Sequence, residues 1–270
     1  MGNARSVETV GVAGPPPTTL AGMQFLTARQ SLQLLGRLIG PMVTLAAHAT
    51  SIAEPYRVLM PSEGSQNAVI LLVPGCSGFA TQHGFNVYEH RARQLQVSGY
   101  VVVFVDYLTR RNLTNCSGGR DVSHADIAKD ILEAAVWARK RASIMPKIYV
   151  MGWSYGGGGV IAALAQMPPG PPILEKAVMF YPDCRRAAAW TTAGVSALML
   201  LGAIDEVALP SLCEALVKKA PADSVRTIVY PGARHAFDVQ SLPQRTEFGG
   251  TGYNAEADQG SWAAALDFLR

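Results

Sequence analysis

The chain has 270 residues, of which 49% are hydrophobic and 16% are charged, and its formal net charge is +3. This composition excludes a largely disordered chain and provides enough apolar surface for a large core. The basic residues occur in short pairs such as Arg110-Arg111, and not in the stripe of a nucleic-acid-binding protein. The Cys and His residues have no metal-ligand spacing. We therefore expect neither a nucleic-acid partner nor a bound metal.

The N-terminus falls into two segments of different composition. Residues 1–22 are rich in Gly, Pro and Thr, and we interpret them as disordered or as a misassigned start. Within residues 23–49, Arg29 and Arg37 precede an apolar run, and Ala47-His48-Ala49 fits a small-x-small cleavage site. This layout predicts a signal peptide, and hence a periplasmic or secreted protein. The alternative is an amphipathic helix on a cytoplasmic protein. No other segment is apolar over enough residues for a membrane span.

Short apolar runs alternate with helical patterns over residues 54–270. The runs are continuous and not alternating, which indicates strands buried on both faces, as in a parallel sheet. The β-α-β order then predicts a single α/β domain with a mostly parallel, doubly wound sheet that binds ligands at the carboxyl ends of its strands. The predicted strands are 68–73, 100–105, 147–151, 176–181, 196–201 and 225–230, and the predicted helices are 87–97, 123–141, 158–167, 211–220 and 256–269.

Gly152-Trp153-Ser154-Tyr155-Gly156 matches the pattern G-x-S-x-G between a predicted strand and a predicted helix. A nucleophile elbow requires this context, because its sharp turn strains the serine backbone and its glycines let strand and helix approach closely. The motif therefore predicts Ser154 as a nucleophile. A phosphate-binding loop is disfavoured because the G-K-[ST] ending is missing.

A serine nucleophile needs a base and an acid that orients it. Only one histidine, His235, follows Ser154, and it lies directly after the strand 225–230. Asp205 follows the strand 196–201, which completes the order Ser, acid, His. We predict His235 as the base and Asp205 as the acid. Glu206 and Asp183 are the alternatives for the acid.

Two backbone N–H groups are expected to stabilise the oxyanion of the reaction. One belongs to Tyr155, the residue after the nucleophile, and the other to Cys76, in the loop after the strand 68–73. A cysteine nucleophile at Cys76 is rejected because this residue follows a different strand. The loop segments 81–84 and 112–120 are interpreted as the variable rim of the pocket.

The four cysteines, Cys76, Cys116, Cys184 and Cys213, allow three complete pairings. Cys184 lies at a strand end and Cys213 near the start of the helix after the next strand, so a disulfide between them is expected. Cys76 and Cys116 lie in loops near the predicted site. Four free thiols are the alternative if the protein is cytoplasmic.

Three segments together resemble the dienelactone hydrolase family, over roughly residues 54–270. These are residues 152–156, residues 202–205 (Gly-Ala-Ile-Asp) and residues 230–238 (Tyr-Pro-Gly-Ala-Arg-His-Ala-Phe-Asp). Residues 106–111 are similar to the family's D-S-F-x-x-R-G loop. The resemblance implies an α/β-hydrolase fold, a small-molecule substrate, and a role for Arg111 either in steering an anionic substrate or in bracing the loop.

Ser154 is a departure from the family pattern, because the founding members have cysteine in G-x-C-x-G. We therefore predict a serine hydrolase that cleaves a carboxylic ester or related acyl compound through an acyl-enzyme, without metal or organic cofactor. One alternative is a small prolyl-oligopeptidase-like peptidase, whose relatives share the G-W-S-x-G-G elbow but usually carry an added N-terminal β-domain. The other is a hydrolase fold that serves only for binding.

Overall fold

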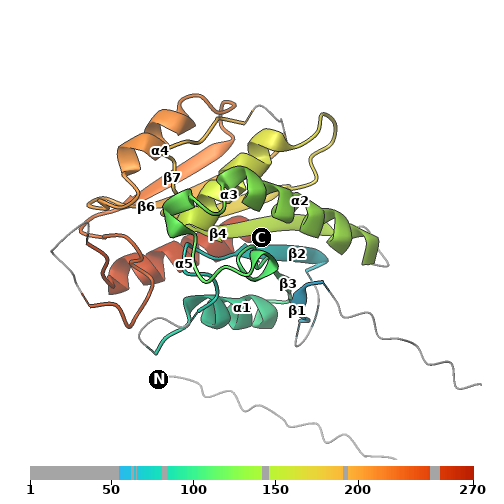
Figure 1. Cartoon of the computed structure of the whole chain (residues 1–270), viewed down its shortest axis with the longest axis horizontal. Helices are drawn as coiled ribbons and strands as arrows, with labels where there is room; N and C mark the ends of the chain where they lie inside the picture. Colours follow the sequence, from blue (N-terminus) through green and yellow to red (C-terminus); the bar gives the residue numbers. More distant parts are fainter. Residues whose placement is uncertain are drawn as a thin grey trace, which may run out of the picture. The chain divides into compact units, whose positions relative to one another are not determined.

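Runs of consecutive aliphatic residues form the interior of a seven-stranded sheet (Figure 1). The computed structural model describes residues 55–61, 64, 66–80, 84–141, 146–190, 194–243 and 250–270, all within one compact unit. The predicted segments 1–22 and 23–49 lie outside the described residues. In sheet order, the strands are β1 (Arg57–Leu59), β3 (Val101–Phe104), β2 (Ala68–Val73), β4 (Lys147–Trp153), β5 (Lys176–Phe180), β6 (Ser196–Gly202) and β7 (Val225–Tyr230).

The sheet is doubly wound and mostly parallel, as predicted. Strand β1 pairs antiparallel with β3, and every other neighbouring pair is parallel. All six residues of β2 are buried, which is the two-sided burial expected from a continuous apolar run. The edge strand β1 was not predicted, because three residues are too short for a periodic signal.

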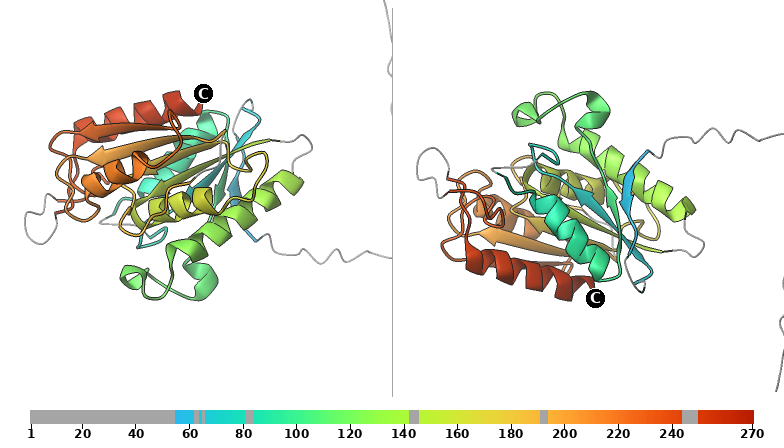
Figure 2. Two further views of the ribbon diagram at one scale, coloured as in Figure 1. Left: turned by 90° about the horizontal axis from the view of Figure 1, so that it is seen from above. Right: turned by 90° about the horizontal axis from the view of Figure 1, so that it is seen from below.

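Helices cover both faces of the sheet (Figures 1 and 2). One face packs against α2 (His124–Arg141), α3 (Ser154–Gln166) and α4 (Pro210–Val217), and the other against α1 (Val87–Val97) and α5 (Ala255–Leu269). Two short 3₁₀ helices, η1 (Thr109–Arg111) and η2 (Ser117–Gly119), lie between β3 and α2. Helix α2 starts where the sequence predicts, because Ser123 and Asp126 hydrogen-bond each other's backbone N–H groups in a cap. Within the described residues, no helix has the length and apolarity needed to cross a membrane.

Helix α3 begins earlier than predicted, at Ser154 and not at residue 158. Each glycine in its first turns makes the helix less stable by about 1 kcal/mol than alanine would. Close packing requires these glycines nevertheless. A Cβ on Gly156 would lie 2.1 Å from the carbonyl oxygen of Pro74, and one on Gly159 would lie 2.3 Å from Cγ2 of Ile127. The glycine run therefore allows α3 to pack directly against α2 and the loop after β2.

Candidate active site

Ser154 occupies the sharp turn between β4 and α3. Its φ is +50°, in the left-handed region that costs a non-glycine residue roughly 1–2 kcal/mol. Neither flanking glycine could carry a side chain without a clash. A Cβ on Gly156 would collide with Pro74, and a Cβ on Gly152 would lie 2.7 Å from Cγ2 of Val160. The turn thus has the strained strand–turn–helix geometry that the motif predicts.

The structure brings Ser154, His235 and Asp205 into one hydrogen-bonded chain. The Oγ of Ser154 lies 2.9 Å from Nε2 of His235, and Nδ1 of His235 lies 2.7 Å from Oδ2 of Asp205. Because the carboxylate can only accept at Nδ1, the proton of a neutral imidazole is held there. Nε2 is then free to accept the proton of the Ser154 hydroxyl.

Asp205 is held by more than the histidine. Its Oδ1 accepts the backbone N–H groups of Val207 and Ala208, both at 2.8 Å, and the residue is buried. The two alternative acids lie elsewhere: Glu206 is exposed, and the carboxylate of Asp183 accepts two hydrogen bonds from the guanidinium of Arg185. Of the three candidate acids, only Asp205 is hydrogen-bonded to His235 within the described residues.

The loop after β2 lies against Ser154, because a Cβ on Gly75 would be 3.4 Å from Cβ of Ser154. Gly75 is fixed on both sides: its N–H donates to the hydroxyl of Tyr88 at 2.9 Å, and its carbonyl accepts from the hydroxyl of Tyr107 at 2.7 Å. In a trans peptide the next N–H points away from that carbonyl. Tyr107 thereby fixes the direction of the Cys76 N–H, the first of the two predicted oxyanion donors.

The second predicted donor, the N–H of Tyr155, lies in the first turn of α3. The first four N–H groups of a helix have no partner within the helix, and they carry its partial positive charge. Tyr155 is anchored at its other end, where the hydroxyl donates to the carbonyl of Val122 at 2.7 Å.

Both disulfides lie beside the site. Cys76 is bonded to Cys116, with the two Cα atoms 4.9 Å apart, and the N–H of Cys116 donates to the carbonyl of Cys76 at 2.9 Å. Cys184 is bonded to Cys213, as predicted, with Cα atoms 5.2 Å apart. The first disulfide ties the loop that carries the predicted oxyanion donor to the segment before η2.

A buried carboxylate that the sequence analysis did not single out lies behind His235. Asp238 is fully buried and accepts the indole N–H of Trp153 at 2.9 Å and the hydroxyl of Tyr181 at 2.5 Å. The ring of Tyr181 meets the His235 ring edge to face, with centroids 4.7 Å apart. Burial raises the pKa of Asp238 above its ordinary value. Asp238 therefore links the residue before the nucleophile to the ring that packs on the base.

Arg111 takes the bracing position. Its guanidinium contacts Oδ2 of Asp130 at 2.5 Å and the carbonyl of Tyr107 at 2.7 Å. Both contacts are made by Nη1, and they join the loop after β3 to α2. They favour the bracing alternative over the substrate-steering one. Among the described residues, no group of three or more His, Cys, Asp or Glu side chains is arranged to hold a metal ion.

Comparisons with known proteins agree with this architecture. A sequence model of the dienelactone hydrolase family matches residues 56–270. A search of curated proteins finds no match. Similar solved structures include a candidate dienelactone hydrolase from Klebsiella pneumoniae, with 18% identity, a TM-score of 0.60, and 78% of this chain and 90% of that chain covered.

Two further structures have the same fold. One is a dienelactone hydrolase from Anabaena variabilis, with 16% identity and a TM-score of 0.56 over 78% of this chain and 88% of that chain. The other is a thermophilic esterase from Thermogutta terrifontis with propionate bound, with 17% identity and a TM-score of 0.55 over 79% of this chain and 88% of that chain. The family model matches nearly all of the residues that the structure describes. The chain therefore belongs to the dienelactone hydrolase family of α/β hydrolases.

Proposed function

We propose that this hydrolase cleaves a carboxylic ester of a small molecule through an acyl-enzyme on Ser154. The observation that carries the proposal is the hydrogen-bonded chain from Ser154 through His235 to Asp205, with the serine at a strained elbow. A serine hydroxyl is a weak nucleophile unless an oriented base can accept its proton, and this arrangement supplies the base and its orientation.

In the proposed mechanism, Nε2 of His235 accepts the proton of Ser154 as Oγ attacks the ester carbonyl. Asp205 stabilises the imidazolium that forms, and the N–H groups of Cys76 and Tyr155 bind the oxyanion. The imidazolium then protonates the leaving alcohol. Water activated by His235 attacks the acyl-enzyme, and the Ser154 hydroxyl is regenerated with release of the acid.

The comparisons support an ester as the substrate class. The structure from Thermogutta terrifontis is of an esterase with propionate bound, and another similar structure is of a dienelactone hydrolase-like promiscuous phosphotriesterase from metagenomic libraries, with 19% identity and a TM-score of 0.55. Both names describe the hydrolysis of an ester, in which negative charge develops on an oxygen that an oxyanion-binding site would stabilise. The serine in place of the family's cysteine is the reason to propose a general acyl ester and not dienelactone.

Turnover of p-nitrophenyl esters tests this proposal. Ser154→Ala should abolish hydrolysis, whereas Ser211→Ala, at an exposed serine in α4, should leave it at the wild-type rate. A p-nitroanilide of the same acyl group separates an esterase from a peptidase. Ester hydrolysis with no anilide hydrolysis supports the proposal. Folded wild-type protein that hydrolyses neither compound would refute it.

We propose in addition that the protein is exported, with residues 23–49 as a cleaved signal peptide. Two disulfides in the described residues support this, because such bonds persist in oxidising compartments. Mass spectrometry of the mature N-terminus after expression in the native host tests the proposal. Cleavage after Ala49 supports export, and retention of Met1 or Met23 contradicts it.

A further inference from the structure

The two edges of the sheet differ in how well they are protected against pairing with another chain. Strand β1 has only three residues and lies between Pro55 and Pro61, and short edge strands and prolines both limit such pairing. Strand β7, at the opposite edge, has six residues, none of which is proline, glycine or lysine. Its register with β6 runs over six residue pairs without a bulge. The edge at β7 is therefore long, regular and unprotected by these devices.

The backbone of β7 has free hydrogen-bonding groups on its outer side. Ala197 of β6 lies opposite Val225, and the N–H of Ala197 donates to the carbonyl of Ser224 at 2.8 Å. In a parallel ladder, this arrangement directs the even-numbered residues of β7 toward β6 and the odd-numbered residues outward. The outward N–H and C=O groups belong to Val225, Thr227 and Val229. Within the described residues, none of these groups forms a hydrogen bond.

The outer side of β7 is complementary to a second copy of itself. In an antiparallel pair, two facing residues exchange both of their N–H···O=C bonds. A two-fold axis at Thr227 places this residue opposite its own copy and Val225 opposite the partner's Val229, so every outward N–H and C=O gains a partner. Each of these facing side chains is β-branched, as in the cross-strand pairs that stabilise sheets. Arg226, the only charged residue of β7, faces the partner's Ile228 and not its own copy.

Exposed apolar side chains lie next to this strand. The N–H of Ile204 donates to the carbonyl of Ala233 at 3.1 Å, which places Ile204 beside the end of β7. Figure 1 shows α4 at the same edge of the sheet. Among the described residues, five of the eight exposed large hydrophobic side chains belong to this region: Ile204, Val207, Leu209, Leu212 and Val229. Exposed apolar side chains gathered beside an open strand edge are typical of an interaction surface.

The exposed side chain of β7 points to the same side of the sheet as α4. Val225 packs against the core cluster that contains Cys213 and Leu216 of α4, whereas Ile228 packs against the cluster on the opposite side. Because side chains alternate along a strand, Val229 shares the side of Val225 and α4. The open strand edge and the exposed apolar side chains therefore belong to one surface.

This surface is large enough for a stable dimer. We define it as residues 203–215 and 222–232 and call it the β7 surface. It contains 21 residues that are exposed or half-buried. A standard protein–protein interface takes about 20–30 residues, or roughly 800 Å², from each partner.

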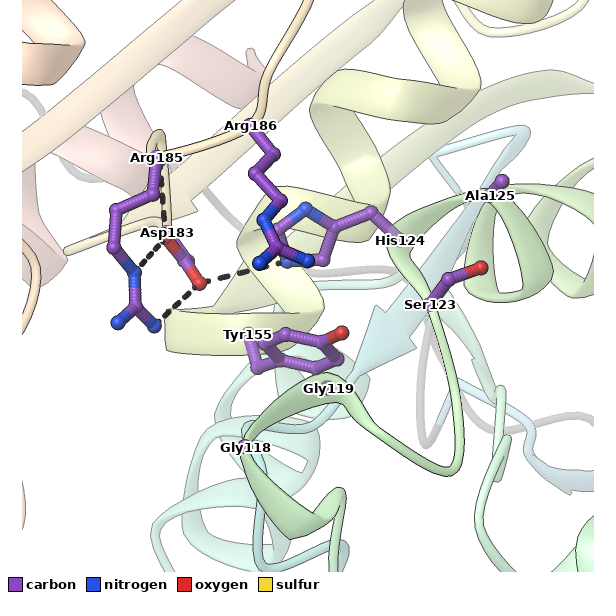
Figure 3. Close-up of a pocket in the computed structure, with 9 residues that line it drawn as sticks. All are labelled: Gly118, Gly119, Ser123, His124, Ala125, Tyr155, Asp183, Arg185 and Arg186. Atoms are coloured by element: carbon purple, nitrogen blue, oxygen red, sulfur yellow. Dashed lines mark hydrogen bonds and ion pairs between the residues drawn. The ribbon is translucent and has the colours of Figure 1, made fainter.

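We infer that the protein forms a homodimer in which two β7 surfaces meet, with their β7 strands antiparallel about Thr227. The two seven-stranded sheets then form one continuous sheet, and the same contact covers the exposed apolar side chains. The candidate active site stays open, because the polar cavity beside the first turn of α3 is lined by no residue of the β7 surface (Figure 3). The inference does not depend on the proposed esterase function.

The mass of the purified protein in solution tests the inference. We expect analytical ultracentrifugation over a range of concentrations to show a particle of two chains that dissociates only on dilution. A single chain at every concentration, including high micromolar ones, overturns the inference.

Two substitutions locate the interface. Val229→Lys places a charge inside the contact, where it loses water without gaining a partner, and should raise the Kd of the dimer about tenfold or more. Thr227→Pro removes an outward N–H but no hydrogen bond to β6, and should weaken the dimer in the same way. The matched control is Val97→Lys, at a valine that is 73% exposed on α1, and it should keep the wild-type Kd. A dimer whose Kd is unchanged by both substitutions has its interface elsewhere, which overturns the inference.

Hydrogen exchange of the wild type tests the strand pairing without any substitution, and so decides the matter even if a variant fails to fold. The N–H groups of Val225, Thr227 and Val229 should be protected where ultracentrifugation shows the dimer, and should exchange freely after dilution to the monomer. Free exchange of these three groups in the intact dimer overturns the pairing through β7.

Discussion

The indole N–H of Trp153 donates a 2.9 Å hydrogen bond to the fully buried carboxylate of Asp238. These two residues are 85 positions apart in the chain. Trp153 directly precedes the proposed nucleophile, and Asp238 follows the proposed base by three residues. The bond therefore joins the end of β4 to the loop that carries His235, and these two segments must stay in register for Ser154 to reach His235.

Replacing Asp238 by Asn tests this link. An amide has one acceptor oxygen, so it can satisfy Trp153 or Tyr181 but not both, and one buried donor is left without a partner. The expected loss of stability is about 1–3 kcal/mol. We also expect kcat to fall, because Tyr181 packs on the His235 ring. Urea denaturation and ester kinetics measure the two effects. Unchanged values for both would show that Asp238 supports neither the stability of the fold nor the position of His235.

The same variant gives a prediction about pH. Burial raises the pKa of Asp238 above its ordinary value of 3.8, so the folded state binds a proton more tightly than the unfolded state does. The stabilisation linked to that proton is fully present below pH 3.8 and is lost as the pH rises through the folded-state pKa. The destabilisation caused by Asp238→Asn should therefore be larger at pH 4 than at pH 7. Urea titrations of both proteins at several pH values check this, and the opposite trend would mean that the carboxylate is more acidic in the folded state.

Asp205→Asn tests the acid that orients His235. An amide at this position can donate to Nδ1, which favours the wrong tautomer of the imidazole, and losses of roughly 10⁴-fold in kcat are known for such a change. We expect a fall of that order. Glu206→Gln is the matched control, because the neighbouring side chain is exposed and outside the hydrogen-bonded chain. Similar rates for the two variants would contradict the assignment of Asp205.

The backbone of Ser154 predicts a difference between two inactive variants. Ser154→Ala and Ser154→Gly both lose the hydroxyl, but only glycine is relaxed at a φ of +50°. The left-handed conformation costs alanine roughly 1–2 kcal/mol, and glycine loses about 0.5–1 kcal/mol through the entropy of the unfolded chain. Ser154→Gly should therefore be the more stable variant by about 0.5–1 kcal/mol in urea denaturation. A less stable glycine variant would mean that the elbow is not strained.

The two disulfides provide a matched pair. They close loops of 40 and 29 residues, for which the chain-entropy model gives about 4 kcal/mol in each case. The double variants Cys76→Ser/Cys116→Ser and Cys184→Ser/Cys213→Ser should thus lose similar stability. Only the first pair should also lower kcat, because Cys76 carries a proposed oxyanion donor. Equal kcat values in the two double variants, measured well below their Tm values, would contradict that role of Cys76.

The parts of the fold and site that the sequence predicts are those with a local signal. The inner strands are continuous apolar runs because both faces are buried. Ser154, Asp205 and His235 each follow one of these parallel strands, which brings the three residues to one edge of the sheet. The start of α3 is missed because glycine has low helix propensity, while close packing against Pro74 and α2 requires it.

Other features depend on contacts that no spacing in the chain reveals. The hydrogen bonds from Trp153 and Tyr181 to Asp238 join distant parts of the chain, as does the disulfide between Cys76 and Cys116. The role of Arg111 could not be predicted from the sequence for the same reason. Whether its guanidinium meets a substrate or Asp130 depends on where α2 lies relative to the loop after β3.

The role of Ser154 as a nucleophile is the central claim, and covalent labelling tests it most directly. Folded wild-type protein should react with a fluorophosphonate probe at one probe per chain, and mass spectrometry of the digested protein should place the added mass on the peptide that contains Ser154. Ser154→Ala should take up no probe. Absence of labelling in the folded wild type, or a label on another residue, would contradict the account.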